Sequence, residues 1–356
     1  MTAPPRLAIV IVNWNVRDLL RDCLAAVRDS EGLAPGEVET IVVDNDSADG
    51  STAMVAAEFP AVRLIESGAN LGFARGCQRG YEATAAPFVM LLNPDTVVDR
   101  DAIATMLATI ANDPAIGILG ARLRNSDGSF QRASGGAFPT LANLAWNYLF
   151  LGHLLPRRWA PPAVYLDDDP PGIRPIDWVS GASLTFRRAA VGPRIFHPAF
   201  FMFGEDMEVC RRVRDAGWKV LYSARQSITH HHGQSFSRQT SLEVLATVYK
   251  GPRFFFRQGR GPLARLCYDA ILFTGYASRW AIFSLLAAVR PGSGHAEMAR
   301  FSRRYLGAMI KTIFREPPLH NRREQNDEQG CKTNIGHRWR RIPRLSSLRQ
   351  ADRPRA

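Results

Sequence analysis

The chain has 356 residues, of which 46% are hydrophobic and 22% are charged, so a wholly disordered or fibrous protein is excluded. The formal net charge of +12 is unevenly distributed: residues 250–356 hold 22 Lys and Arg against 7 Asp and Glu, whereas residues 1–249 hold 23 against 26. A slightly acidic part therefore precedes a strongly basic one. This distribution argues against a uniformly basic protein, such as one that binds nucleic acid over its whole surface.

The five cysteines are odd in number and too far apart in sequence for a CxxC motif. A disulfide framework or a zinc knuckle is therefore not expected, and reduced thiols in the cytoplasm are the simplest interpretation. The apolar run near the N-terminus is short and ends at the polar Asn13, unlike the apolar core of a signal peptide. We expect a first β-strand there.

Hydrophobic patterning predicts alternating strands and helices along the first third of the chain. Continuous apolar runs rich in β-branched residues predict buried strands at 7–13, 38–44, 62–66, 88–93 and 116–119. Apolar residues at helical spacing predict helices between them, at 15–28, 54–58, 73–85 and 101–111. This alternation predicts an α/β fold with a mainly parallel central sheet flanked by helices.

Polar residues follow each of the first four predicted strands. They are Asn13, Asn15, Asp44, Asn70, Asn93 and Asp95. Open α/β sheets bind ligands beyond the carboxyl ends of their strands, so these residues predict one polar cleft. The alternative for each residue alone is a turn or a helix N-cap, which Asn and Asp also favour. No GxGxxG follows the first strand and no Walker A motif occurs, which argues against a dinucleotide or P-loop site.

Seven motifs then occur in one order over about residues 6–260. They are VIVNWN (10–15), VVDNDSADGS (42–51), NLGFARGCQRG (70–80), LLNPDT (91–96), GASLTFRR (181–188), FGEDMEVCRRVRDAGW (203–218) and HHHGQS (230–235). In this order and spacing the chain resembles the GT-A-fold glycosyltransferases of family 2, particularly their bacterial rhamnosyltransferase-like branch. The resemblance implies a GT-A fold and a site for a nucleotide sugar.

In similar enzymes an Asp at the position of Asp44 binds the uracil or thymine base, by accepting a hydrogen bond from the pyrimidine N3–H. Asn13 and Asn15, at the neighbouring strand end, are then expected to complete the nucleotide pocket. The alternative for Asp44 is a helix N-cap, although other residues of the same segment are available for that role.

The NPD sequence stands where this fold usually carries a DxD motif that holds Mg²⁺ or Mn²⁺ against the donor diphosphate. Here Asn93 replaces the first Asp, and Asp95 is the anionic ligand. His230 is expected as a further metal or phosphate contact, because imidazole suits ions such as Mn²⁺. His231 and His232 are alternatives, since three consecutive histidines leave the register open.

Glu205 and Asp206 form a carboxylate pair at the start of a predicted helix. An inverting glycosyltransferase needs a base for the acceptor hydroxyl, and similar enzymes use an Asp here. We therefore expect Asp206 to be the base and Glu205 to orient the acceptor. A charged first helical turn is the alternative. By resemblance, Trp178 and Gly181 would lie near the acceptor or the donor sugar.

The basic last third is predicted to form an amphipathic helical extension at 250–314 and a disordered basic tail at 315–356, after a transferase domain at 1–249. The apolar window 266–289 is interrupted by Asp269 and Arg279, so an interfacial or buried helix is favoured over a membrane span. Basic residues around apolar ones suit an anionic membrane surface. Packing on the core or on a second copy of the chain is the alternative. No motif supports nucleic-acid binding by the tail.

These expectations describe a cytoplasmic enzyme, peripheral at the inner face of the cytoplasmic membrane. It would be an inverting glycosyltransferase of cell-wall polysaccharide biosynthesis, moving rhamnose from dTDP-rhamnose, or a sugar from a UDP-sugar, to a polyprenyl-linked or polysaccharide acceptor. One alternative is another hexosyl or galactofuranosyl transferase of the same fold. The other is a non-catalytic binding module at the membrane, which the intact Asp44, Asp95, Asp206 and His230 disfavour.

Overall fold

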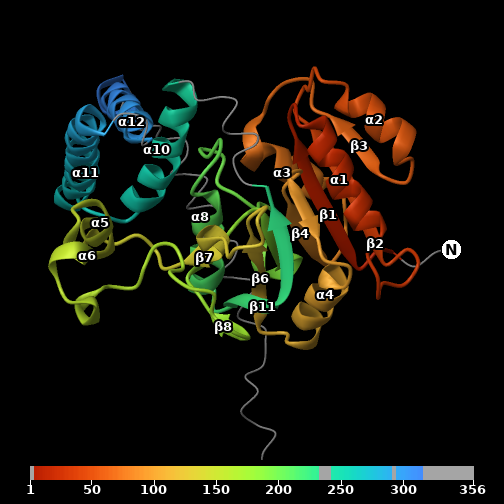
Figure 1. Cartoon of the computed structure of the whole chain (residues 1–356). Coiled ribbons are helices and arrows are strands. Elements are labelled where there is room, and N and C mark those ends of the chain that lie inside the picture. The colour runs from red at the N-terminus through yellow and green to blue at the C-terminus, as the bar shows by residue number, and fades with distance from the viewer. Residues whose placement is uncertain (1–3, 232–241, 291–293, 316–356) are drawn as a thin grey trace, which may run out of the picture. The chain divides into compact units, whose positions relative to one another are not determined.

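The computed structural model describes residues 4–231, 242–290 and 294–315. Their centre is a nine-stranded sheet with the order β3-β2-β1-β4-β10-β6-β11-β5, in which β8 also pairs with β11 (Figure 1). The strands are β1 (Leu7–Asn13), β2 (Val38–Asp44), β3 (Arg63–Glu66), β4 (Phe88–Leu92), β5 (Thr96–Val98), β6 (Ile116–Arg124), β8 (Ile173–Pro175), β10 (Ser183–Arg187) and β11 (Lys219–His230). A separate two-stranded sheet pairs β7 (Gly135–Gly136) with β9 (Trp178–Val179).

The strands β3, β2, β1 and β4 run parallel, as the apolar runs predicted. Asn13 lies opposite Asp44 in this register, so the polar ends of β1 and β2 meet at one edge of the sheet. β10 was not predicted. It runs antiparallel between β4 and β6 and starts beside the end of β4. Periodicity identifies a buried strand but not its direction, and β10 lies far from its partners in sequence.

Helices cover both faces of the sheet, because successive residues of each buried strand point to opposite faces. Val10 and Val43 pack with α3 (Gly72–Glu82) and α8 (Glu205–Asp215) on one face. Ile9 and Val42 pack with α1 (Arg17–Arg28), α2 (Ser51–Glu58) and α4 (Ala102–Asn112) on the other. Short helices follow at α5 (Leu141–Tyr148), α6 (Leu151–Leu154) and α7 (Arg188–Val191), with 3₁₀ turns at η1 (Arg132–Ser134) and η2 (Arg157–Trp159).

α3 approaches β1 more closely than a helix with side chains on that face could. A Cβ added to Gly76 would lie 2.7 Å from Val12 Cγ1, and one added to Gly80 would lie 2.4 Å from Val10 Cγ1. The glycines therefore allow direct contact between the helix backbone and the strand side chains, which sets the position of α3 over the strand ends.

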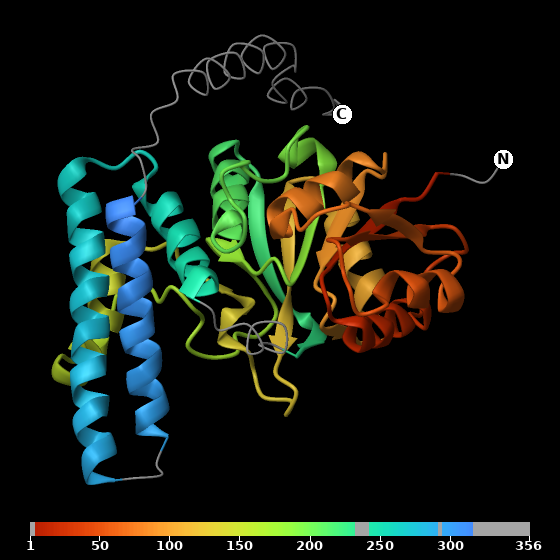
Figure 2. The ribbon, with the colours of Figure 1, turned by 90° about the horizontal axis from the view of Figure 1, so that it is seen from above.

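Three long helices complete the described chain: α10 (Leu242–Arg257), α11 (Pro262–Val289) and α12 (His295–Arg315). α11 and α12 lie side by side, and their rings Tyr276 and Tyr305 stack with centroids 4.1 Å apart (Figure 2). Residues up to Thr312 form one compact unit. The predicted boundaries after residues 249 and 314 stay predictions, and all but the first residue of the predicted tail, 315–356, lies outside the described residues.

Candidate active site

The carboxyl ends of β1 and β2 are joined by a network around Asp44. Asn13 Nδ2 donates to Asp44 Oδ1 at 2.8 Å, and the Ser47 backbone N–H donates to Asp44 Oδ2 at 2.8 Å. Asp44 is not the N-cap of α2, because Gly50 occupies that position. The N-cap alternative for Asp44 is therefore wrong, and its carboxylate instead holds the turn after β2.

Two further asparagines shape the same edge of the sheet. Asn15 Oδ1 accepts a hydrogen bond from the Ala48 N–H at 2.7 Å, and Asn70 Oδ1 accepts one from the Gly72 N–H at 2.9 Å, at the start of α3. Asn45, which sequence reasoning did not select, donates to the Gly72 carbonyl oxygen at 3.0 Å. Asn45 ties the end of β2 to α3.

Asn13 and Asn45 also share a feature that turn formation does not explain. Their side-chain oxygens are buried and have no hydrogen-bond partner among the described residues. Buried acceptors are nearly always satisfied, so two unsatisfied ones at adjacent strand ends are expected where a ligand binds.

The predicted metal contacts come together although Asn93 and His230 are 137 residues apart. His230 Nε2 lies 3.2 Å from Asp95 Oδ1 and 3.3 Å from Asn93 Nδ2. The cause is the antiparallel pairing of β5 with β11, which sets His230 opposite Thr96. Asp95 and His230 are 5% and 6% exposed, so this pair lies largely out of bulk water.

The structure also separates the consecutive histidines. His231 Nδ1 lies 2.8 Å from Ser126 Oγ, and the His231 backbone N–H donates to the Asp95 carbonyl oxygen. The His231 ring therefore has a partner outside the Asp95 pair. His232, with the rest of the HHHGQS motif, lies outside the described residues, so His230 is the described histidine that faces Asp95.

The Asp95 and His230 pair fits two neighbouring ligands of a divalent ion. Ligands at about 2.1 Å and at right angles around an octahedral ion are about 3.0 Å apart, close to the 3.2 Å found here. No group of three or more His, Cys, Asp or Glu able to hold a metal occurs within the described ranges. Such a short set of protein ligands is typical of Mg²⁺-type ions that are shared with substrate phosphates.

The carboxylate pair lies at the first turn of α8, after Gly204, whose φ of 87° needs glycine. Asp206 Oδ1 accepts from the Met207 N–H at 2.8 Å, and Asp206 Oδ2 faces the Gly181 N–H at 3.4 Å. A Cβ on Gly181 would lie 3.3 Å from the Phe73 ring, so the backbone approaches Asp206 closely here. The predicted residues Asp206 and Gly181 are thus neighbours.

Burial gives the two carboxyl groups different pKa values. It raises the pKa of Asp206 to about 6. Burial, and next the charge of Asp206, raise the pKa of Glu205 well above its usual range. Glu205 is 4% exposed and its Oε2 has no partner among the described residues, whereas Asp206 is half-buried. Asp206 ionises first, which suits a base; a direct contact of Glu205 with an acceptor stays a prediction that this burial does not favour.

Trp178 is 3% exposed, and its indole N–H donates to the carbonyl oxygens of Ala137 and Val164 at 3.2 and 3.0 Å. Its side chain is therefore a buried anchor between the small sheet and the preceding loop. The predicted contact of Trp178 with a sugar stays a prediction, and Gly181 is the member of this pair that reaches Asp206.

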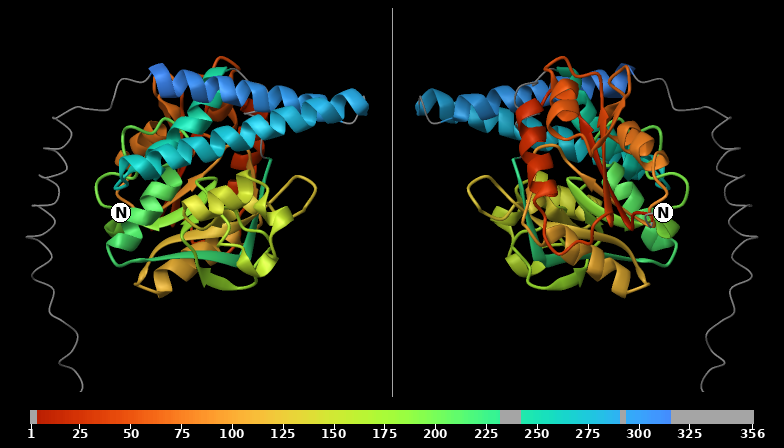
Figure 3. Two further views of the ribbon diagram at one scale, coloured as in Figure 1. Left: turned by 90° about the vertical axis from the view of Figure 1, so that its left-hand side faces the viewer. Right: turned by 90° about the vertical axis from the view of Figure 1, so that its right-hand side faces the viewer.

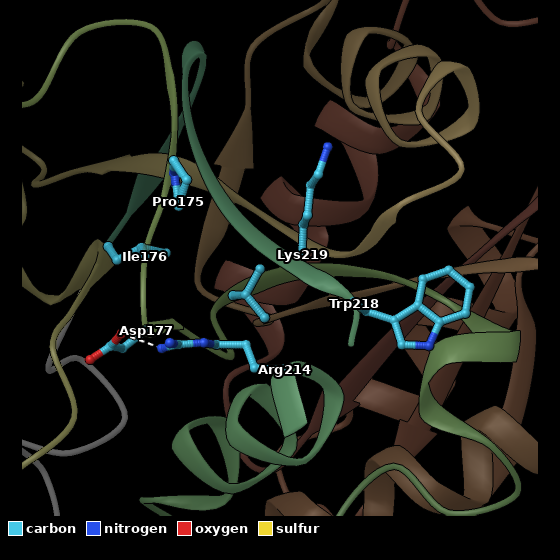
Figure 4. Close-up of a pocket in the computed structure, with 7 residues that line it drawn as sticks. Pro175, Ile176, Asp177, Arg214, Trp218 and Lys219 are labelled. Atoms are coloured by element: carbon cyan, nitrogen blue, oxygen red, sulfur yellow. Dashed lines mark hydrogen bonds and ion pairs between the residues drawn. The ribbon is translucent and has the colours of Figure 1, made fainter. Parts of the chain in front are cut away.

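A surface depression of about 210 Å³ lies elsewhere. It contains the ion pair of Asp177 and Arg214, and no predicted site residue lines it (Figure 4). Its lining residues are Pro175, Ile176, Asp177, Arg214, Trp218, Lys219 and Val220. Because the predicted site residues meet at the strand ends and not in this depression, we place the candidate site at the strand ends.

Known proteins resemble this chain in sequence. Residues 8–169 match the family described as glycosyl transferase family 2. The chain is 29% identical over 221 residues to the N-acetylglucosaminyl-diphospho-decaprenol L-rhamnosyltransferase of Mycobacterium tuberculosis, a match that covers 59% of this chain and 71% of that relative.

Solved structures show the same fold. A mannosyltransferase from Pyrobaculum calidifontis, in complex with GDP-mannose and Mn²⁺, superposes with a TM-score of 0.55 at 15% identity and covers 89% of each chain. A GalNAc transferase with UDP, GalNAc and Mn²⁺ superposes with a TM-score of 0.50 at 13% identity, over 87% of this chain and 56% of that one. The fold expected from the motifs, GT-A, is confirmed.

Proposed function

Because the chain carries a family 2 glycosyltransferase domain over residues 8–169, it is a glycosyltransferase, and we propose that it transfers rhamnose with inversion to a polyprenyl-linked glycan. One observation carries the proposal. The Asn93 N–H donates to the Ala182 carbonyl oxygen at 3.0 Å, and the adjacent Gly181 N–H faces Asp206. The two residues that precede β10 thus link the metal motif to the base, as transfer between a donor diphosphate and an acceptor hydroxyl requires.

We assign the donor diphosphate to the Asp95 and His230 pair. Mg²⁺ or Mn²⁺ held there would neutralise negative charge on the departing nucleoside diphosphate. Two structural neighbours were solved with Mn²⁺, which supports a divalent ion in this fold. Asn93, whose Nδ2 lies 3.3 Å from the ring of His230, belongs to the same contact.

Asp206 is the proposed base. It takes the proton of the acceptor hydroxyl while that oxygen bonds to the anomeric carbon and the bond from the anomeric carbon to the diphosphate oxygen breaks. Glu205, held protonated by burial, adds no second negative charge beside the entering oxygen. The anomeric configuration inverts because attack and departure occur on opposite faces of the sugar.

The nucleotide is assigned to the ends of β1 and β2. Asp44 and Asn15 form its floor, with Asn13 and Asn45 contributing their unsatisfied side-chain oxygens and Asn70 shaping the start of α3. The relative's printed name supports rhamnose as the sugar and a decaprenyl diphosphate-linked GlcNAc as the kind of acceptor. The donor would be dTDP-rhamnose, with a UDP-sugar as the alternative.

We place the enzyme at the cytoplasmic membrane surface, and the charge pattern of α11 supports this. α11 is long and apolar enough to cross a membrane, yet Asp269 and Arg279, two of its charged residues, are tied to the protein. Asp269 accepts hydrogen bonds from Arg253 and Tyr249, and Arg279 donates to the carbonyl oxygens of Asn147 and Tyr148. A span would break these contacts in lipid, so an interfacial position fits better.

The exposed residues of α11 include none with a charge; the large apolar ones are Leu263, Leu266, Phe273, Trp280, Ile282, Leu285, Leu286 and Val289. Leu263, Leu266 and Leu285 are 73%, 66% and 70% exposed. Figure 3 shows α11 and α12 extending together past the sheet. α12 adds exposed Arg300, Arg303, Arg304 and Lys311, cations that an anionic leaflet attracts. A second copy of the chain is the alternative occupant.

A donor panel tests the proposed reaction. The full chain is incubated with dTDP-rhamnose, UDP-sugars and GDP-sugars, with Mg²⁺ or Mn²⁺ and a short-chain polyprenyl diphosphate-linked GlcNAc. We expect product from dTDP-rhamnose. If product forms only from another donor, the assigned sugar would change and the reaction would still be glycosyl transfer. The absence of nucleotide binding and of nucleotide release with every donor would favour a non-catalytic binding module instead.

A further inference from the structure

Gln131 lies on the side of the His230 ring that faces away from Asp95. It follows β6, its backbone N–H donates to the Leu123 carbonyl oxygen at 2.9 Å, and its side chain is 5% exposed. Gln131 Oε1 lies 2.7 Å from His230 Nδ1, within the distance of a strong hydrogen bond. The buried amide therefore decides what the ring nitrogen beside it can do.

The orientation of the Gln131 amide is fixed by its other contacts. Its Nε2 donates to Asn125 Oδ1 at 2.9 Å and to the backbone carbonyl oxygen of His230 at 3.3 Å. A carbonyl oxygen cannot donate, so the NH₂ group has to point there and Oε1 has to face the ring. Asn125 is fixed in turn: the Ser129 hydroxyl donates to Asp127 Oδ1 at 2.6 Å, so Ser129 Oγ accepts from Asn125 Nδ2 at 2.9 Å.

This orientation sets the protonation pattern of the His230 ring. An acceptor at 2.7 Å requires that Nδ1 carry the proton, so in the neutral ring Nε2 carries the lone pair. Nε2 accepts from Asn93 Nδ2 at 3.3 Å, in keeping with a lone pair there, and faces Asp95 Oδ1 at 3.2 Å. Two atoms that offer lone pairs to the same space repel each other, and a cation between them turns the repulsion into binding.

We propose that Gln131 is a positioning residue, which holds the His230 ring in the Nδ1–H tautomer and aims Nε2 at the ion shared with the donor diphosphate. The proposal rests on the proposed metal site. Second contacts of this kind orient histidine ligands, and removing one lowers metal affinity by about 10- to 100-fold in known metal sites.

The tautomer is read directly in the metal-free protein. The full chain is labelled with ¹⁵N-histidine, long-range ¹H–¹⁵N spectra are recorded, and the His230 signals are assigned by their loss in His230→Gln. We expect Nδ1–H in the wild type and a shift toward the other tautomer in Gln131→Met, which removes the acceptor oxygen. An Nε2–H tautomer in the wild type would overturn the proposal.

Mn²⁺ binding in the presence of dTDP is measured on the same variants by electron paramagnetic resonance. Gln131→Met should bind Mn²⁺ about tenfold more weakly or worse. The matched control is Ser126→Ala, which removes the Nδ1 partner of His231 and should leave both measurements unchanged. Equal affinity in Gln131→Met and the wild type would overturn the positioning role.

Failure of the metal site itself gives a different result. If the wild type binds no Mn²⁺ with any nucleotide, the proposed metal role of Asp95 and His230 fails, and the positioning role with it. The spectra still record whether Gln131 sets the tautomer. The two failures are therefore distinguishable.

Discussion

The sheet domain and the C-terminal helices handle charge in opposite ways. At the strand ends, polar groups are gathered and largely buried: Asp44, Asp95 and His230 are 3%, 5% and 6% exposed. In α11, the charged groups Asp269 and Arg279 are bound to the protein and the apolar side chains face outward. Burying polar groups is costly unless they are hydrogen-bonded or bind a ligand. A large exposed apolar face is also costly, and it usually marks a surface that another molecule covers.

The difference teaches that net charge alone is a poor guide to this chain. In our proposal the chemistry belongs to the part with almost no net charge, where a few carboxylates and amides meet. The basic part is proposed to provide location, because its apolar strip and its cations suit an anionic surface. Each prediction below tests one side of this division.

The largest effect is expected from Asp206→Asn. The amide cannot take the acceptor proton, so turnover should fall by about 10³-fold, while donor binding measured by calorimetry stays within about twofold. Asp215→Asn, at the exposed far end of α8, is the matched control and should keep wild-type turnover. Near-normal turnover in Asp206→Asn would remove the base assignment.

The next largest effect is expected at α11. Replacing Leu263, Leu266 and Leu285 together by Gln removes three exposed apolar side chains, each worth about 1.5–3 kcal/mol when buried, so binding to phosphatidylglycerol vesicles should fall by more than about 100-fold. Flotation of the full chain with vesicles measures this.

The matched control places Met at the same three positions, where it keeps the apolar face and should keep vesicle binding. Transfer to a water-soluble acceptor should persist in both variants. If vesicle binding is unchanged while a dimer dissociates in light scattering, the α11 face contacts a second copy instead.

A smaller effect is expected at the pair of Asp95 and His230, and it depends on the proposed metal site. Asp95→Asn keeps the shape but loses the anionic ligand, so Mn²⁺ affinity measured with dTDP present should fall at least about tenfold. The control is Asp99→Asn, since Asp99 is a carboxylate near the same loop and is not assigned to the metal. Equal Mn²⁺ affinity in Asp95→Asn and the wild type would rule out Asp95 as a ligand.

The pH dependence follows from the raised pKa of Asp206, about 6. A raised pKa means that the carboxyl group keeps its proton up to that pH, and a protonated base cannot accept another. The value of kcat/KM should therefore fall about tenfold per unit as the pH drops below about 6 and level off above it. Nucleotide affinity recorded over the same range separates this loss from unfolding, and a flat profile down to pH 5 would contradict it.

The smallest effect concerns packing. Gly76→Ala places a Cβ 2.7 Å from Val12 Cγ1, so overpacking should lower the free energy of unfolding by about 1–3 kcal/mol. Gly307→Ala is the matched control, because nothing lies within 4 Å of its new Cβ on the exposed side of α12. Alanine should raise stability there by up to about 1 kcal/mol. Chemical denaturation measures both changes.

Much of the parallel half of the fold could be predicted, because strands buried on both faces read as continuous apolar runs. β1 and β2 have the predicted bounds, and the polar residues after β1, β2 and β4 lie at one edge. β5 is only three residues long and β10 pairs antiparallel with strands distant in sequence, so local patterning could not give either.

The site divides in the same way. Asp95 and His230 were predicted by resemblance, and their contact depends on the pairing of β5 with β11, which no local pattern contains. Gln131 was missed because its role arises from a hydrogen bond to a residue 99 positions away. Asn45 lies within a recognised motif, but it was not selected as a site residue. Trp178 was selected as a sugar contact, and the structure gives its N–H to two backbone carbonyls.

The central claim is that Asp206 and a metal held at Asp95 act on one sugar nucleotide. Its most direct measurement is the formation of rhamnosylated acceptor from dTDP-rhamnose by the wild type and by Asp206→Asn, each with Mn²⁺ and with chelator. We predict product only with the wild type and Mn²⁺, while both proteins bind dTDP. Equal product from both proteins, or product that chelation leaves unchanged, would contradict the claim.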